Sequence, residues 1–245
     1  MVAILRSMTF EKLIVDDPAA AALPLVEAAI VGAVAERGRA VVALSGGSSP
    51  LPLFRMLAGS DLPWERLWVT FGDERFVPVT HEHSNAGAAI RELLGEVPVP
   101  TEQILTWPVL DDPAESAHEY RRQLESALGT FPTFDMNLLG LGDDGHTASL
   151  FPGTGAVLLA GPTLAVRAPD YATPGGWRLS MSAAALSNSH EVIFLAPGAN
   201  KVEALRSTFG PEARAAQGSA EELDAHPARA ISARGRLTVV TDVAF

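Results

Sequence analysis

The chain has 245 residues, and none of them is cysteine. This absence excludes disulfides, thiolate nucleophiles and cysteine-ligated zinc. It also fits a reducing compartment, so we expect a cytoplasmic protein.

Positive charge is also scarce. Lysine and arginine number 18 against 29 acidic residues, which gives a formal net charge of -11 and a pI near 4.9. Nucleic-acid binding depends on clustered Lys and Arg that neutralise phosphates, and no basic run appears, so we expect no nucleic-acid partner. An acidic chain that binds a small anion must gather a few cations and backbone amides into one pocket.

The sequence shows no clear targeting or membrane segment. Residues 1–10 have no apolar core followed by a small-residue cleavage site, so no signal peptide is predicted. No apolar run reaches the roughly 18 residues that a spanning helix needs. Residues 28–34 come closest, and Glu27 and Glu36 bracket them. We therefore predict an amphipathic helix there and no membrane partner.

The residues that are present can build a large core. Hydrophobic residues make up 47% of the chain, and the 19% of charged residues is too low for a disordered or coiled-coil protein. The length is near the upper end of a single domain, and α/β folds often reach it as one unit. We expect one domain over residues 1–245, and a monomer.

Short β-branched runs alternate with longer helical periods, which is typical of a largely parallel sheet covered by helices. The predicted fold class is α/β, with three layers: a mostly parallel, doubly wound (Rossmann-like) sheet and helices on both faces. Strands are predicted over residues 40–44, 67–71, 134–141 and 191–195. Helices are predicted over residues 17–38, with a kink or restart at Pro24, and over 50–57, 84–94, 112–128 and 201–206; residues 206–229 are predicted to be surface helix and loop.

Polar segments follow the predicted strands at their carboxyl ends, where open α/β sheets bind their ligands. The first is Ser45-Gly46-Gly47-Ser48-Ser49-Pro50. Its glycines let the backbone turn sharply and approach a ligand, while free amides and hydroxyls can meet an anion. It suits a phosphate, bound by Gly46, Gly47, Ser48 and Ser49, although a tight turn with serine capping is the alternative. It matches neither common nucleotide-binding glycine motif, which disfavours ATP and NAD.

The second polar segment is Gly72-Asp73-Glu74-Arg75. It places two carboxylates beside a guanidinium that can clamp phosphate through two hydrogen bonds. The acid pair can instead support proton transfer, and a solvated loop with a local ion pair is the structural alternative. The nearby His81-Glu82-His83 offers at most two imidazoles and no third ligand, so no metal is predicted.

The third polar segment, residues 142–153, is the sharpest signal in the sequence. Its two glycines at 142 and 145 set His146 beside Asp143 and Asp144 at a strand end. Histidine titrates near neutral pH and can take a proton from water. A satisfied structural histidine is the alternative.

Two further cations lie outside these segments. Lys201, where a loop enters a predicted helix, offers a point charge to phosphate. Arg178, in Trp177-Arg178-Leu179-Ser180, is either a pocket cation or an exposed strand residue.

Taken together and in this order, these segments resemble the 6-phosphogluconolactonase family of the pentose phosphate pathway. The most specific stretch is Gly145-His146-Thr147-Ala148-Ser149-Leu150-Phe151-Pro152. The family's Gly-Gly-Ser-Thr-Pro loop is matched by Gly46-Gly47-Ser48-Ser49-Pro50. Its Asp-Glu-Arg segment, which is followed by Ser-Asn, is matched by Asp73-Glu74-Arg75 and Ser84-Asn85. Its Gly-x-x-Lys motif is matched by Gly198-Ala199-Asn200-Lys201. The similarity runs from Ser45 to Lys201 and is weaker over residues 227–242.

The resemblance implies hydrolysis of 6-phospho-D-glucono-1,5-lactone without a metal, a cofactor or a covalent intermediate. By this similarity His146 would be the catalytic base, and Arg75 and Lys201 would hold the phosphate. Asp144 would orient or support the imidazole, although the sequence leaves open whether Asp144 or Asp143 faces His146. The developing oxyanion would be stabilised by glycine-loop amides or by Arg178.

Two rival functions belong to similar folds. Glucosamine-6-phosphate deaminases and isomerases resemble this family but carry an acidic residue five positions after the histidine, where this chain has Phe151. A phenyl ring cannot accept a proton, so this alternative is disfavoured. A non-catalytic phosphosugar sensor would keep the phosphate loop and Lys201 without needing His146. No N-terminal helix-turn-helix or basic surface supports that function.

Overall fold

The computed structural model of the chain describes residues 10–211, 213 and 218–245, so part of the predicted 206–229 segment lies outside the described residues. The strands are β1 (Glu11–Ile14), β2 (Ala40–Leu44), β3 (Leu67–Phe71), β4 (Asp73–Arg75), β5 (Phe134–Leu139), β6 (Thr163–Arg167), β7 (Trp177–Met181), β8 (Ser189–Leu195) and β9 (Arg236–Thr241). The α-helices are α1 (Pro18–Arg37), α2 (Leu51–Leu57), α3 (Asn85–Ala89), α4 (Pro113–Leu128), α5 (Ala183–Ser187), α6 (Val202–Phe209) and α8 (Ala220–Ala225).

The main sheet has six strands in the order β1-β9-β8-β5-β2-β3, and every neighbouring pair is parallel. From β2 the chain adds β3 on one side and later β5, β8 and β9 on the other. The direction of winding therefore reverses between β2 and β5, and open sheets bind ligands outside the carboxyl ends of their strands at such a point. The predicted α/β fold class is confirmed.

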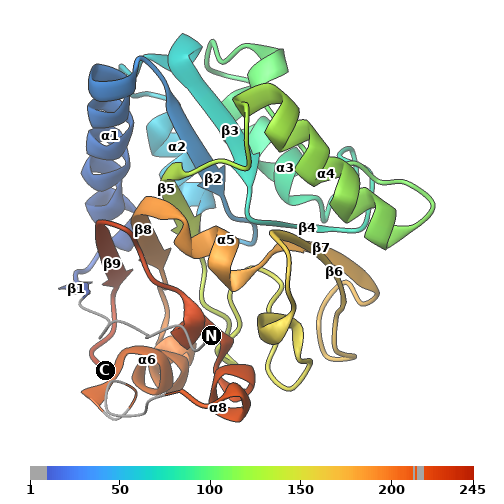
Figure 1. Cartoon of the computed structure of the whole chain (residues 1–245). Coiled ribbons are helices and arrows are strands. Elements are labelled where there is room, and N and C mark those ends of the chain that lie inside the picture. The colour runs from blue at the N-terminus through green and yellow to red at the C-terminus, as the bar shows by residue number, and fades with distance from the viewer. Residues whose placement is uncertain (1–9, 212, 214–217) are drawn as a thin grey trace.

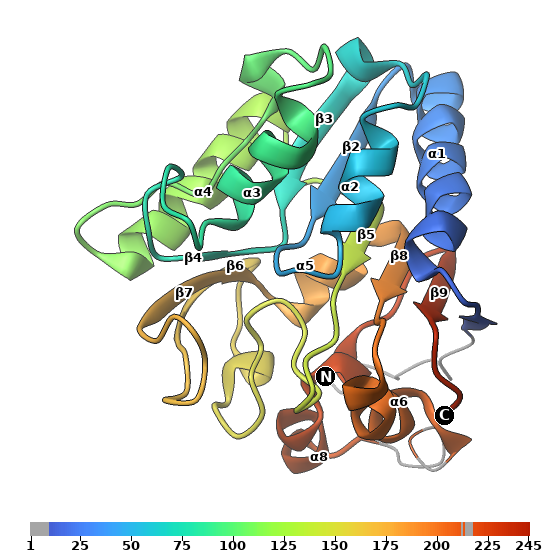
Figure 2. The ribbon, with the colours of Figure 1, turned by 180° about the vertical axis from the view of Figure 1, so that it is seen from behind.

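Helices cover both faces of this sheet. Figure 1 shows α4 and α5 in front of it, and Figure 2, seen from behind, shows α2 and α3 in front. α1 contacts α2, β2, β5, β8 and β9. The buried apolar side chains of the strands and helices form one contiguous core cluster among the described residues. The sheet and its helices thus give the loops at the carboxyl ends a rigid base.

α1 is the longest helix described and runs through Pro24 as one continuous helix, so the predicted restart at Pro24 does not occur. Asp17 caps its first turn by accepting from the Ala20 amide, and Gly38 ends it with a φ of 75°.

An 18-residue window of α1 has a mean hydropathy of 1.8, so by length and composition this helix can cross a membrane. Glu27 interrupts this window, so an uninterrupted apolar run of about 18 residues, the feature sought in the sequence, does not occur in α1. Here the helix lies on the sheet and buries one stripe: Ala22, Val26, Ile30 and Ala33.

A second, three-stranded sheet in the order β4-β7-β6 is antiparallel and was not predicted. Gly72 links the two sheets, because its amide donates to Leu44 O at 3.0 Å and its carbonyl accepts from the Met181 amide at 2.8 Å. The chain therefore leaves β3 in one sheet and enters β4 in the other within a single residue. The segment Asp73–Arg75, predicted to be a polar loop, is a strand of this sheet.

Candidate active site

Two adjoining cavities of about 380 Å³ and 200 Å³ lie at the carboxyl ends of the parallel strands. They share a wall made by Asp73, Arg75, Gly142, His146, Ala148 and Lys201. Each predicted site residue lines at least one of the two: Gly46, Gly47, Ser48, Ser49, Asp73, Arg75, Asp144, His146, Arg178 and Lys201. We call the two cavities together the cleft.

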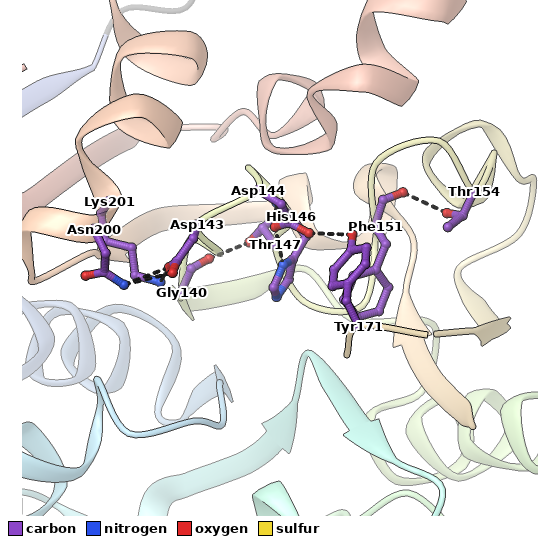
Figure 3. Close-up of polar contacts among 10 residues, drawn as sticks. All are labelled: Gly140, Asp143, Asp144, His146, Thr147, Phe151, Thr154, Tyr171, Asn200 and Lys201. Carbon is purple, nitrogen blue, oxygen red and sulfur yellow. Dashed lines mark hydrogen bonds and ion pairs between the residues drawn. The ribbon is translucent and has the colours of Figure 1, made fainter. Parts of the chain in front are cut away.

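His146 and Asp144 form a tight pair in the cleft. The imidazole Nδ1 lies 2.6 Å from Asp144 Oδ1, which also accepts from the His146 backbone amide at 3.0 Å (Figure 3). Burial opposes ionisation of Asp144, but the hydrogen bonds from His146 and from the Tyr171 hydroxyl outweigh it and hold the pKa of Asp144 well below its usual range. With Asp144 ionised, Nδ1 carries the proton of the neutral ring, which leaves Nε2 able to accept one.

The backbone of the 142–148 loop is shaped to hold this pair. A Cβ on Gly142 would lie 2.0 Å from His146 Nδ1 and 2.6 Å from Asp144 Oδ1, so no larger residue fits there. Gly145 has a φ of 87°, which favours glycine. Ala148 has a φ of 48°, a left-handed conformation that is uncommon for alanine, and it lines both cavities.

Asp143 faces the other way, toward Lys201. Lys201 Nζ forms an ion pair with Asp143 Oδ1, and Asn200 Nδ2 donates to both carboxylate oxygens of Asp143 at 2.9 Å (Figure 3). Partial burial would raise the pKa of Asp143, but these contacts lower it overall. The two adjacent carboxylates therefore have different partners: Asp144 meets the imidazole and Asp143 meets the lysine.

The glycine loop presents unused donors to the cleft. Within the part of the chain that the structure describes, the backbone amides of residues 46–49 and the hydroxyls of Ser48 and Ser49 donate to no protein acceptor. A Cβ on Gly46 would lie 1.7 Å from Asn85 Oδ1, so this loop packs directly on Asn85. Such a group of amides, with Arg75 and Lys201 lining the same cavity, suits an anion.

Asp73 lines the cleft, yet both of its carboxylate oxygens already have partners. Asn85 Nδ2 donates to Oδ1 at 3.0 Å, and Ser149 Oγ donates to Oδ2 at 2.6 Å. Its neighbour Glu74 is buried beneath the site, where it accepts from four donors: the Ser84 hydroxyl and the amides of Arg75, Asn85 and Ala86. Burial raises the pKa of Glu74. Glu74 thus fixes the start of α3, and it does not line the cleft.

Arg75 and Arg178 sit directly opposite each other on the antiparallel strands β4 and β7. Arg178 is only 3% exposed, so of its two predicted placements the pocket cation is correct and the exposed strand residue is wrong. Burial, and then the charge of Arg75, lower its pKa. Two cations at one register position repel unless an anion lies near them.

No group of three or more metal-ligating residues occurs among the described residues. In the His81-Glu82-His83 segment, the His83 amide donates to His81 Nδ1 at 3.1 Å, so one of the imidazole nitrogens already has a partner.

Comparisons with known proteins show the family to which the chain belongs. Residues 15–240 match the family model described as glucosamine-6-phosphate isomerases/6-phosphogluconolactonase. The chain belongs to this family. It is 40% identical to the 6-phosphogluconolactonase of Synechocystis sp., in a match that covers 90% of this chain and 89% of that one. It is 39% identical to the 6-phosphogluconolactonase of Nostoc sp., in a match that covers 92% of this chain and 91% of that one. The crystal structure of 6-phosphogluconolactonase from Thermotoga maritima has the same fold, with a TM-score of 0.83 at 22% identity, and the match covers 95% of this chain and 99% of that one.

Several residues that were not predicted as site residues contact the site in the structure. Tyr171 donates to Asp144 Oδ2 at 2.7 Å, and the ring of Phe151 lies 4.7 Å from the ring of His146. Asn85 and Ser149 hold Asp73, and Asn200 holds Asp143. The family motifs recognised in the sequence contain four of these residues, Asn85, Ser149, Phe151 and Asn200, so their place in the motifs could have identified them as site residues. Tyr171 lies in a loop with no motif.

Proposed function

We propose that the protein hydrolyses 6-phospho-D-glucono-1,5-lactone to 6-phosphogluconate, the lactone-opening step of the oxidative pentose phosphate pathway. The observation that carries this proposal is the pairing of His146 with an ionised Asp144 in a cleft whose other wall offers free amides, Arg75 and Lys201. A base and an anion site in one cleft are what a phosphorylated lactone requires.

In the proposed mechanism, the neutral imidazole of His146 accepts a proton at Nε2 from a water molecule as the water oxygen attacks the lactone carbonyl carbon. Asp144 holds the ring and stabilises the imidazolium that forms. Glycine-loop amides or Arg178 stabilise the oxyanion. The ring C–O bond then breaks, and the imidazolium returns its proton to the leaving ring oxygen, so the enzyme ends in its starting state.

The phosphate binds, in this proposal, to the amides and hydroxyls of residues 46–49 together with Arg75 and Lys201. Arginine can clamp a phosphate through two hydrogen bonds, and lysine supplies a point charge. Lys201 must then share its charge between Asp143 and the phosphate. No step needs a metal or a covalent intermediate, because a lactone is already an activated ester and the site supplies position and a base.

The isomerase or deaminase alternative is not favoured. That chemistry moves protons between carbons, and the resemblance to those enzymes leads us to expect an acidic residue at position 151. Here Phe151 packs its ring against His146 instead. A non-catalytic sensor would leave the pairing of His146 with Asp144 unused.

The experiment is proton release on adding freshly generated lactone, in buffer with a chelator, for wild type, His146→Ala and Lys201→Ala. We expect wild type to exceed the spontaneous rate clearly, His146→Ala to lower kcat by about 10²–10⁴-fold, and Lys201→Ala to raise KM by about 10–100-fold. The matched controls are His118→Ala, at an exposed position on α4, and Lys12→Ala, at the chain's only other lysine. Wild type at the spontaneous rate would refute the lactonase, and binding without turnover would indicate a sensor.

We also propose a monomeric, cytoplasmic, single-domain enzyme whose partner is the phosphosugar lactone. The single contiguous core among the described residues and the absence of cysteine support this. Light scattering of the purified chain tests the mass, and a second unfolding transition would contradict the single domain.

A further inference from the structure

The loop between β6 and β7, residues 168–176, forms one wall of the larger cavity. Its two ends are joined by the Ala168 amide, which donates to Gly176 O at 2.9 Å. Tyr171, Ala172 and Thr173 from this loop line the cavity. The antiparallel sheet thus supplies Arg178 and this loop to the larger cavity, and the loops that follow the parallel strands supply the other residues.

Tyr171 is the contact between this loop and the base. Its hydroxyl donates to Asp144 Oδ2 at 2.7 Å, while Asp144 Oδ1 forms hydrogen bonds with the ring and the backbone amide of His146 (Figure 3). Both oxygens of the carboxylate are therefore held, from opposite sides, by groups on two different loops. A carboxylate held at both oxygens cannot rotate about its side-chain bond without losing one of these contacts.

Core packing does not account for Tyr171. The residue is 65% exposed, which is unusual for a large aromatic side chain in a fixed position. Its hydroxyl is nevertheless placed at hydrogen-bond distance from a catalytic carboxylate. Partial desolvation of the hydroxyl, its hydrogen bond to Asp144 and the charge of that carboxylate raise the pKa of Tyr171 to about 12. The hydroxyl therefore stays protonated and remains a donor across the neutral range.

We propose that Tyr171 is a positioning residue for the lactonase reaction: by holding Asp144 Oδ2, it fixes the orientation of His146 and sets how strongly the carboxylate favours the imidazolium. This inference rests on the proposed function. Donation from Tyr171 draws negative charge away from Asp144, so the imidazolium is stabilised less and gives its proton back to the leaving oxygen more readily. The same contact makes the 168–176 loop part of the catalytic machinery.

The test compares Tyr171→Phe with Tyr120→Phe, which removes the chain's only other tyrosine hydroxyl. The Tyr120 hydroxyl is buried away from the cleft, where it accepts from the Phe71 amide and donates to Leu105 O. Tyr171→Phe should lower kcat by about 5–10-fold, the loss expected for one hydrogen bond, with KM changed less than about twofold. The acidic limb of its kcat/KM profile should move to higher pH. Tyr120→Phe should lower Tm and leave the pH profile where it is.

A second readout does not depend on turnover. In the free protein, the NMR titration of the His146 ring, assigned with His146→Gln, should have its midpoint at higher pH in Tyr171→Phe than in wild type. Superimposable titration curves, or a kcat within twofold of wild type, would overturn the role of Tyr171. If wild type itself does not open the lactone, the proposed function fails, while the titration still decides whether Tyr171 acts on the pair of Asp144 and His146.

Discussion

The two sides of the cleft differ in how their polar groups are satisfied. On what we call the imidazole side, formed by Asp144, His146, Phe151 and Tyr171, the carboxylate oxygens and Nδ1 are bonded to one another within the protein. On the anion side, formed by residues 46–49, Arg75 and Lys201, the loop amides have no protein acceptor among the described residues. The Arg75 side chain makes one hydrogen bond among these residues, to His83 O, and Lys201 is paired with Asp143.

This difference matches the two tasks that we propose for the cleft, base catalysis and anion binding. The imidazole side is organised before any substrate arrives, so its groups need no rearrangement when the reaction begins. In the proposed function the anion side is completed by the ligand, because its loop donors are solvent-accessible and would exchange water for phosphate oxygens. Changes on the imidazole side should therefore lower kcat, and changes on the anion side should raise KM.

The largest effect should follow Gly142→Ala, which breaks the imidazole side. The new Cβ would lie 2.0 Å from His146 Nδ1, so the ring must leave Asp144. We expect kcat to fall by about 10²–10⁴-fold, as when a general base is lost. The control is Gly32→Ala, at an exposed position of α1 outside the cleft, where a Cβ meets nothing within 4 Å. Near-normal kcat in Gly142→Ala, or an equal loss in Gly32→Ala, would contradict the argument.

A smaller effect, on KM, should follow Gly46→Ala on the anion side. Its Cβ would lie 1.7 Å from Asn85 Oδ1, and Asn85 is itself held through Nδ2 by Asp73, so the loop must shift. We expect KM to rise by about 10–100-fold, the loss of one or two hydrogen bonds to a charged ligand, with kcat changed only slightly.

Inorganic phosphate gives a second measure of the anion side. It should raise the Tm of wild type and of His146→Ala, because a ligand that binds only the folded state stabilises it, and it should raise the Tm of Gly46→Ala less. Gly32→Ala, on the exposed side of α1 where a Cβ meets nothing within 4 Å, is the control. A fall in kcat at constant KM in Gly46→Ala would mean that the two sides do not divide binding from chemistry.

Four neighbouring strands of the parallel sheet, β8, β5, β2 and β3, were predictable because each contains a short run of buried apolar residues, whereas β9 and the mostly exposed β1 were missed. β2 and β5 have every residue buried, and Asp17, Asp112 and two glycines mark the ends of the long helices. In the antiparallel sheet, β4 and β7 were missed because they carry polar residues toward the cleft: Asp73, Arg75 and Arg178. In β7, Arg178 and Leu179 are both buried, so neither alternation nor hydrophobicity indicates a strand.

The candidate site was predictable where one motif contains both partners, as for His146 and the two carboxylates beside it. Which carboxylate meets the imidazole depends on backbone angles at Gly142 and Gly145, and a sequence does not contain them. Tyr171 reaches Asp144 across 27 residues from another sheet, so no local pattern connects them. Long-range contacts of this kind are known only once the chain is folded.

The smallest effect concerns acid stability, and it compares the imidazole side with ordinary surface carboxylates. The pKa of Asp144 is lower in the folded state than its ordinary value of 3.8, because the hydrogen bonds from His146 and Tyr171 outweigh the opposing burial. The folded state then binds fewer protons than the unfolded state. The stabilisation by Asp144 is therefore fully present above that ordinary value, and it is lost as pH falls through the lower, folded value.

Asp144→Asn should remove this acid-sensitive contribution. Between pH 5 and about pH 3 the free energy of unfolding should fall in both proteins, but the fall in Asp144→Asn should be smaller than the fall in wild type by about 1–2 kcal/mol. This magnitude is typical of hydrogen bonds to a charged group. Asp170→Asn, at an exposed position one residue before Tyr171 with no ion pair among the described residues, should follow the wild-type curve. Thermal unfolding at closely spaced pH values measures the difference. Parallel curves for wild type and Asp144→Asn would mean that the contacts holding Asp144 do not favour its ionised form, and the imidazole side would then lack the charge that we assign to it.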